Sequence, residues 1–200
     1  MSILKVIRSN VLVSPHWLAR LRGCGDEINI LDCSWHLPNA GRNAKEEYFQ
    51  KHIPGAQFFD IDACCDKSTQ LPHMLPNAET FEKYVGSLGI RDNSLTLLYD
   101  NHPIFAVFSA PRVWWTFRYF GHTNVGILEG GLPTYESFGY DVTSDVKAVE
   151  EEDFFARPKS QYVRTLADVQ DNIRTKQFQL IDARPSGRFN GTEPEPRPGK

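Results

Sequence analysis

The alternation of strand-like and helix-like segments through residues 1–140 constrains the fold of this chain more than any other feature. Short apolar runs in this region are separated by segments with helical periodicity or helix-capping residues. Parallel neighbours in a sheet need a long crossover, usually a helix, between one strand and the next. We therefore predict an α/β domain in which a parallel sheet carries helices on both faces. The four runs are INILDCSW, AQFFDI, LTLLYD and NVGILEG.

Helix starts can be predicted from residue type. Ser14 is followed by Pro15, which is the pattern of an N-cap and a proline at the first helical position, and Gly23 predicts the end of that helix. Asn77 is predicted to cap a second helix, and Ser109 opens a third that is rich in aromatic residues.

The chain changes character after residue 140. Residues 141–160 are acidic and polar with little periodicity, which is typical of a linker. Residues 161–200 then repeat the early order of capped helix, strand and aspartate, so that Asp182 corresponds to Asp32. We interpret this as an internal duplication: a domain at 1–140, a linker, and the incomplete start of a second copy.

Composition excludes several classes of protein. The net charge of −3 offers no basic stripe for a nucleic acid, and no apolar run approaches the roughly 20 residues that span a bilayer. The first residues lack the apolar region and cleavage site of a secretory signal. We expect a cytoplasmic protein, with a mitochondrial address as the alternative because the N-terminal stretch is mildly basic.

The four cysteines give no metal signature. Cys24, Cys33, Cys64 and Cys65 lack the spacing of a zinc site, and we predict neither a metal nor an organic cofactor. Reduced, buried thiols are the expected state, and whether any of the four is reactive stays open.

Four longer motifs, HIPGAQFFDID, SAPRVWWTFRYFGH, LEGGLP and GRFNGTEPEPR, resemble the tandem-rhodanese sulfurtransferases. The resemblance extends through essentially the whole chain, in order, and is closest to the 3-mercaptopyruvate enzymes. It implies a rhodanese-like domain followed by the beginning of a second one. It also implies that the sulfur-carrying cysteine of the family belongs to a loop of the second domain, beyond residue 200.

Asp100 is the residue that resembles the cysteine position in the first domain. A carboxylate cannot accept a sulfane sulfur, because it has no soft nucleophile with which to form the S–S bond. The following segment, NHPIFAVF, is apolar and lacks the glycines expected in a cradle of backbone N–H groups. We therefore predict a non-catalytic domain without such a cradle.

Arg188 and Arg197 flank a turn-rich loop and suit a small carboxylate, since each guanidinium can donate two parallel hydrogen bonds. From the residues alone, solvated arginines that balance Glu193 and Glu195 are the simpler interpretation. The resemblance implies the first role, with the substrate carboxylate and keto oxygen as the bound groups. Arg197 also separates the mercaptopyruvate branch from the thiosulfate branch, which has a non-basic residue there.

Asp62 and His73 lie eleven positions apart, across a polar loop. A histidine beside a carboxylate can shuttle protons near neutral pH, whereas a turn aspartate and a surface histidine are the simpler alternative. The resemblance implies a relay that these two residues form with a serine of the second domain.

The resemblance implies a sulfurtransferase that moves sulfur from 3-mercaptopyruvate to a thiol acceptor, such as thioredoxin or glutathione, through a cysteine persulfide. We expect this chain alone to be inactive. The alternatives are a non-catalytic module or truncated product that binds a partner, and a thiosulfate sulfurtransferase. Residues 161–200 are too few to bury their apolar side chains, among them Phe178, Leu180 and Ile181, so we predict weak order or self-association there.

Overall fold

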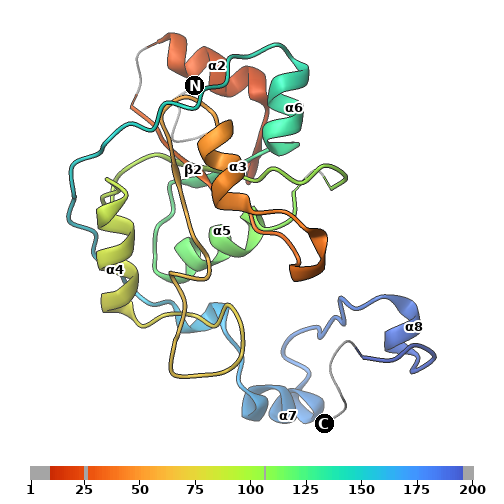
Figure 1. Ribbon diagram of the computed structural model, residues 1–200. Helices are drawn as coiled ribbons and strands as arrows, with labels where there is room; N and C mark the ends of the chain where they lie inside the picture. Colours follow the sequence, from red (N-terminus) through yellow and green to blue (C-terminus); the bar gives the residue numbers. More distant parts are fainter. Residues whose placement is uncertain (1–9, 25–26, 106, 196–200) are drawn as a thin grey trace. The chain divides into compact units, whose positions relative to one another are not determined.

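A computed structural model describes residues 10–24, 27–105 and 107–195, and these fall into two units, 1–160 and 161–200. The first unit contains a five-stranded sheet of order β1-β5-β4-β2-β3 (Figure 1). Every neighbouring pair is parallel, which confirms the predicted sheet type. The edge strand β1 was not predicted, because two residues are too few to show a pattern. The strands are β1 (Leu12–Val13), β2 (Asn29–Asp32), β3 (Ala56–Phe58), β4 (Thr96–Tyr99) and β5 (Val125–Leu128).

Helices of the first unit begin at the predicted caps. The Ser14 hydroxyl accepts the Trp17 N–H, and the Asn77 side chain accepts the Thr80 N–H. Ser109 precedes its helix as predicted, but its hydroxyl donates to the Cys33 carbonyl instead of capping. The helices of this unit are α2 (Pro15–Gly23), α3 (Ala44–Gln50), α4 (Ala78–Ser87), α5 (Ala110–Tyr119) and α6 (Gly131–Ser137), with a 3-10 turn at Pro38–Ala40. Another 3-10 turn, Ser160–Tyr162, spans the boundary between the two units along the chain.

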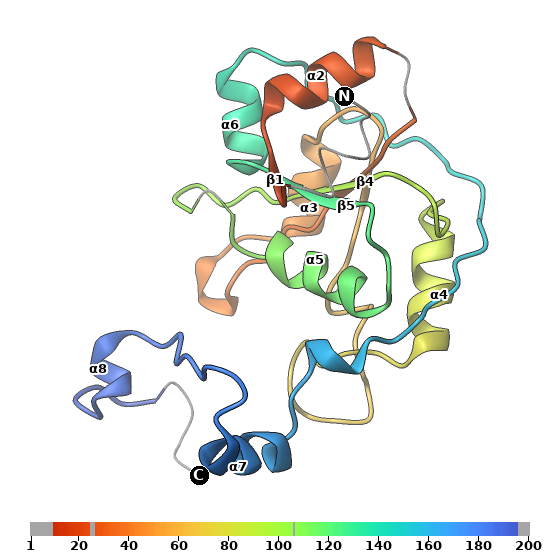
Figure 2. The ribbon, with the colours of Figure 1, turned by 180° about the vertical axis from the view of Figure 1, so that it is seen from behind.

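Helices cover both faces of the sheet: α2, α3 and α6 lie on one side, and α4 and α5 lie on the other (Figures 1 and 2). Successive strand residues point to opposite faces, so each strand feeds two cores. In β2, Ile30 packs in the core under α2, α3 and α6, whereas Leu31 packs in the core under α4 and α5. The sheet is therefore buried on both faces, as its near-continuous apolar strands predict.

The segment 141–160 is irregular, as its sequence predicts, and it packs along the first unit. Phe154 is buried against Phe81, with ring centroids 5.6 Å apart. The Glu152 N–H donates to the carbonyl of Gly86, a helical residue at which an added Cβ would come within 2.3 Å of the Glu152 carbonyl oxygen. The linker assignment stays a prediction, to which the structure adds a fixed contact with α4.

The second unit contains α7 (Leu166–Thr175) and α8 (Ser186–Phe189). Thr165 and Asp168 form a capping box at the start of α7, which confirms the predicted cap. The strand predicted before Asp182 is wrong for the described residues 161–195, where the chain is irregular and Leu180 and Ile181 are exposed. A parallel strand needs a neighbouring strand for its hydrogen bonds, and this unit supplies none among those residues. None of the helices in the described part of the chain is long and apolar enough to cross a membrane.

Gly131→Ala should destabilise the first unit strongly. Gly131 has φ +58°, and an added Cβ would lie 2.1 Å from the carbonyl oxygen of Asp100. A left-handed backbone costs an alanine about 1–2 kcal/mol, and overpacking against a fixed backbone adds about 1–3 kcal/mol. Gly139→Ala is the matched control, because Gly139 has φ +77° but nothing within 4 Å of an added Cβ. Urea unfolding should show the larger loss at 131, and equal losses would contradict the close approach.

Candidate functional site

The polar groups of the first unit gather at the carboxyl ends of the central strands, where open parallel sheets place their ligand sites. Asp32 ends β2, and Asp100 directly follows β4. Asp62 lies in the loop after β3, so three neighbouring strands each deliver an aspartate to the same edge.

Asp100 sits in a cradle of backbone N–H groups. Its Oδ2 accepts hydrogen bonds from the N–H groups of Phe108, Ser109 and Ala110 at 2.7, 2.9 and 2.9 Å. The prediction that this loop lacks such a cradle is therefore wrong. The anion is attached to the chain, so no ligand has to approach the backbone closely and the loop can form without glycines. The cradle holds a carboxylate, and the correspondence of Asp100 to the cysteine of a catalytic domain stays a prediction.

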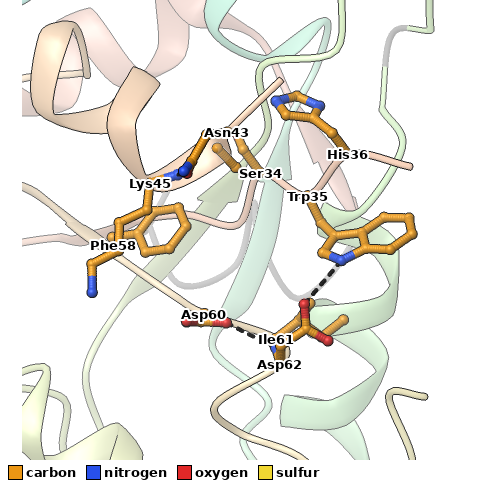
Figure 3. A pocket seen from close by; sticks show the side chains of 10 residues that line it. Ser34, Trp35, His36, Asn43, Lys45, Phe58, Asp60, Ile61 and Asp62 are labelled. Atoms are coloured by element: carbon orange, nitrogen blue, oxygen red, sulfur yellow. Dashed lines mark hydrogen bonds between the residues drawn. The ribbon is translucent and has the colours of Figure 1, made fainter. Parts of the chain in front are cut away.

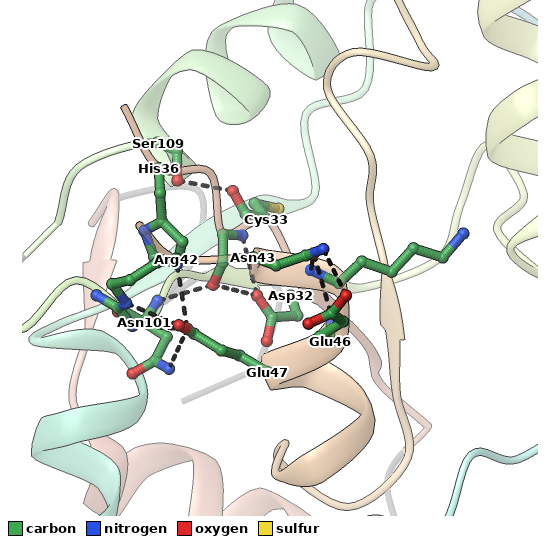
Figure 4. A network of polar contacts seen from close by, with 11 residues as sticks. Asp32, Cys33, His36, Arg42, Asn43, Glu46, Glu47, Asn101 and Ser109 are labelled. Carbon is green, nitrogen blue, oxygen red and sulfur yellow. Dashed lines mark hydrogen bonds and ion pairs between the residues drawn. The ribbon is translucent and has the colours of Figure 1, made fainter. Parts of the chain in front are cut away.

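A buried hydrogen-bond network joins the carboxylate of Asp32 to the backbone of Asn101, the residue that follows Asp100 (Figure 4). Asp32 Oδ1 accepts from the N–H of Ser34 at 2.9 Å and from its hydroxyl at 2.5 Å, and the Ser34 Oγ accepts the Asn101 N–H at 2.9 Å. Burial raises the pKa of Asp32 to about 6, and the negative charge of Asp100 adds to the rise while the Ser34 hydrogen bonds oppose it. Asp32 is thus a carboxyl group that titrates close to neutral pH.

Ion pairs and hydrogen bonds of Arg42 fix the start of the loop after β4. Arg42 donates to both oxygens of Glu47, at 2.7 and 2.6 Å, and to the Asn101 carbonyl at 3.0 Å. His36 Nε2 lies 3.1 Å from the same carboxylate. Although burial opposes ionisation of Glu47, the hydrogen bonds from Arg42 and His36 hold its pKa below the usual value. These contacts tie the loop to α3.

Asp62 and His73 are brought together, with Asp62 Oδ1 and His73 Nε2 3.0 Å apart. The indole N–H of Trp35 donates to Asp62 Oδ2 at 3.1 Å (Figure 3). The Trp35 ring also meets the His73 ring edge-on, with the ring centroids 4.8 Å apart. Arg112 donates to the His73 carbonyl, and His73 itself has φ 56°. The predicted contact therefore exists, while the proton relay stays a prediction. Sequence reasoning identified neither Trp35 nor Arg112 as a support of the pair.

The surroundings of the four cysteines do not activate them as nucleophiles. Cys33 and Cys64 are buried, and burial raises the pKa of Cys33 well above its usual value and that of Cys64 to about 12. A thiol that resists ionisation is a poor sulfur nucleophile. Cys65 is half-buried and donates to the Asp62 carbonyl at 3.1 Å, and Cys24 is exposed. Across the described ranges, the acidic, histidine and cysteine side chains form no cluster of three that could hold a metal ion.

The predicted arginines belong to the second unit. Arg188 Nε lies 3.3 Å from a carboxylate oxygen of Glu195, so these two residues form an ion pair. Arg197 lies outside the described residues. The role of both arginines as ligands of a substrate carboxylate stays a prediction.

A pocket of about 190 Å³ opens beside Asp62 (Figure 3). It lies between the loops that follow β2 and β3 and the start of α3. Trp35, Phe58 and Ile61 form its apolar surface, and Lys45 and Asp60 bring opposite charges to it.

Comparison with known proteins shows the following similarities. The rhodanese-like domain family matches residues 14–137. The chain is 42% identical over 191 residues to 3-mercaptopyruvate sulfurtransferase of Homo sapiens, covering 94% of this chain and 64% of that protein. It is 43% identical over 188 residues to thiosulfate sulfurtransferase of Bos taurus, covering 92% and 63%. The chain thus spans less than two thirds of these curated relatives.

Two solved structures agree with this fold. SseA from Escherichia coli, described as a 3-mercaptopyruvate sulfotransferase, has a TM-score of 0.82 and 37% identity, covering 94% of this chain and 71% of that one. Tum1 from Saccharomyces cerevisiae has a TM-score of 0.80 and 29% identity, covering 94% and 65%.

The buried Asp32 carboxyl should make stability fall as pH rises. Its pKa is 3.8 when unfolded and about 6 when folded, so its contribution is complete below pH 4 and lost as pH passes 6. The loss amounts to about 3 kcal/mol. Asp32→Asn keeps an oxygen acceptor for Ser34 and removes the titration. The unfolding free energy of the variant minus that of the wild type should therefore rise by about 2–3 kcal/mol between pH 4 and pH 7. A difference that does not change with pH would contradict the assignment.

Proposed function

The chain belongs to the rhodanese-like family, and on that premise we propose that it supplies a non-catalytic domain and part of the substrate site of a 3-mercaptopyruvate-type sulfurtransferase. The contact between Asp62 and His73, at 3.0 Å, carries this proposal. A histidine held by a carboxylate is suited to proton transfer, and this pair belongs to the carboxyl edge of the sheet, where open α/β folds bind ligands.

The proposed reaction has two sulfur transfers. A cysteine thiolate, which is none of the four in this chain, attacks the sulfur of 3-mercaptopyruvate, so that an S–S bond forms and the C–S bond breaks. The electron pair of that C–S bond leaves on the enolate of pyruvate, and His73 supplies the proton, with Asp62 orienting the imidazole. Arg188 and Arg197 hold the carboxylate and keto oxygen of the donor. A second thiol then attacks the persulfide, takes its outer sulfur and releases the thiolate.

Thiosulfate is the alternative donor, and the relatives include enzymes named for either donor at nearly equal identity. The Asp62–His73 pair favours 3-mercaptopyruvate, because thiosulfate leaves as sulfite and no enolate has to be protonated. A purely binding module is the second alternative, and the carboxylate of Asp100 in its cradle favours it. Both alternatives share the non-catalytic first domain.

The partners of the proposed reaction are small molecules or small redox proteins. A sulfur donor and a thiol acceptor such as thioredoxin or glutathione are needed, and no metal, organic cofactor, nucleic acid or membrane takes part. Self-association through residues 161–200, where Leu180 and Ile181 are exposed, belongs to the same proposal. The cytoplasm, with the mitochondrion as alternative, remains the expected compartment.

The 200-residue chain alone should not carry sulfur. Incubated with 3-mercaptopyruvate or with thiosulfate and a thiol acceptor, it should show no turnover above the protein-free rate. Mass spectrometry of the alkylated protein should find none of the four cysteines with an added sulfur atom. Stoichiometric sulfur on Cys64 or Cys65 during turnover would contradict the proposal.

His73→Gln should separate the two donors in a longer protein that carries this sequence together with the cysteine-bearing half of the family. Loss of the proton donor should lower kcat with 3-mercaptopyruvate by about a hundredfold or more. The rate with thiosulfate should change little. His16→Gln is the control, because His16 lies on α2 and contacts Tyr140. Equal loss with both donors would count against the relay.

A further inference from the structure

The pocket beside Asp62 is lined by polar and charged side chains together with a few apolar ones (Figure 3). Trp35 and Phe58 supply two aromatic faces, and Ile61 adds an aliphatic one. A volume of about 190 Å³ limits the occupant to a small organic molecule or to one end of a larger one.

Most polar side chains that line this pocket are already committed to protein partners. Ser34 bonds to Asp32 and Asn101 through its hydroxyl. The Asn43 carbonyl caps α3 and its amide donates to Glu46, while both oxygens of Asp62 are taken by His73 and Trp35. A ligand that used these groups would have to break existing bonds.

Two charged groups remain available. Lys45 is exposed, and its ammonium has no carboxylate within ion-pair distance among the described residues. Asp60 Oδ1 accepts the N–H groups of Asp62 and Ala63 at 2.9 and 3.1 Å, which fixes the carboxylate. Its Oδ2 has no hydrogen-bond partner within the described part of the chain. The pocket therefore presents the unpaired ammonium of Lys45 and the fixed carboxylate of Asp60, whose Oδ2 is available to a ligand.

A zwitterion complements this arrangement. An α-ammonium would pair with Asp60 and an α-carboxylate with Lys45, while the side chain of the ligand lies against Trp35 and Phe58. 3-Mercaptopyruvate fits less well, because it has no ammonium and its negative charge would face an unpaired Asp60. The pocket thus suits the acceptor of the proposed reaction better than the donor.

We infer that this pocket binds the α-amino-acid end of a low-molecular-weight thiol, the chemistry shared by cysteine and the γ-glutamyl end of glutathione. Its role as acceptor site rests on the proposed function: the thiolate of the bound molecule attacks the outer sulfur of the enzyme persulfide, one S–S bond forms, another breaks, and the enzyme thiolate leaves. Binding itself requires no turnover, so it can be tested separately from that function.

The test is a titration of the 200-residue chain followed by NMR at the indole N–H of Trp35, assigned by its loss in Trp35→Phe. The probes are L-cysteine, glutathione, cysteamine and 3-mercaptopropionate. At least one of the first two should bind saturably. Cysteamine, which lacks the carboxylate, and 3-mercaptopropionate, which lacks the ammonium, should each bind about tenfold or more weakly, because each loses one charge-assisted pair. The compound with the lower Kd, cysteine or glutathione, identifies which of these two thiols the pocket recognises.

Two variants locate the charges. Lys45→Met should abolish the preference for cysteine over cysteamine, and Asp60→Asn, which keeps the Oδ1 acceptor, should abolish the preference over 3-mercaptopropionate. Lys147→Met, at an exposed lysine of the 141–160 segment, should change neither preference. The inference is overturned by no saturable shift with cysteine or glutathione, by equal binding of all probes, or by preferences that survive both variants.

Discussion

The carboxylate of Asp100, held by the N–H groups of Phe108, Ser109 and Ala110, is the contact on which the rest of this site depends. It fixes the course of the loop between β4 and α5 and stabilises the start of α5 with a negative charge. It also fills the position that resembles a sulfur-carrying cysteine with a group that cannot form an S–S bond. One side chain therefore holds the loop in place, and its assignment as the substitute for a nucleophile stays a prediction.

The same strand end organises its surroundings. The Asp100 carbonyl accepts the Leu132 N–H, and it approaches so closely that only glycine fits at position 131. Ser34 joins Asp32 to the backbone of Asn101, so two buried carboxylates lie at the ends of neighbouring strands. The close packing at this edge of the sheet therefore explains both the glycine at position 131 and the raised pKa of Asp32.

Sequence reasoning predicted the parallel sheet, its four longer strands and the caps at Ser14 and Asn77, because periodicity and capping are local signals. The cradle at Asp100 was missed, since hydrogen bonds from a loop to a preceding strand depend on the loop path and not on its glycine content. The strand before Asp182 was predicted from a local pattern, whereas pairing requires a neighbour. Asp62 and His73 were identified through the family resemblance. The hydrogen bond from Trp35 to Asp62 could not be predicted from the sequence, because α3 and β3 separate these two residues along the chain.

We propose that the Asp62–His73 pair acts on the sulfur donor and that the adjacent pocket binds the thiol acceptor. The cradle of N–H groups in the same domain is occupied by the carboxylate of Asp100. Native-state hydrogen exchange at the amides of Phe108, Ser109 and Ala110 tests this central contact most directly. In the wild-type chain these three amides should exchange slowly, and in a folded Asp100→Ala variant they should exchange about a hundredfold or more faster. Equal exchange rates in the two proteins would contradict the account.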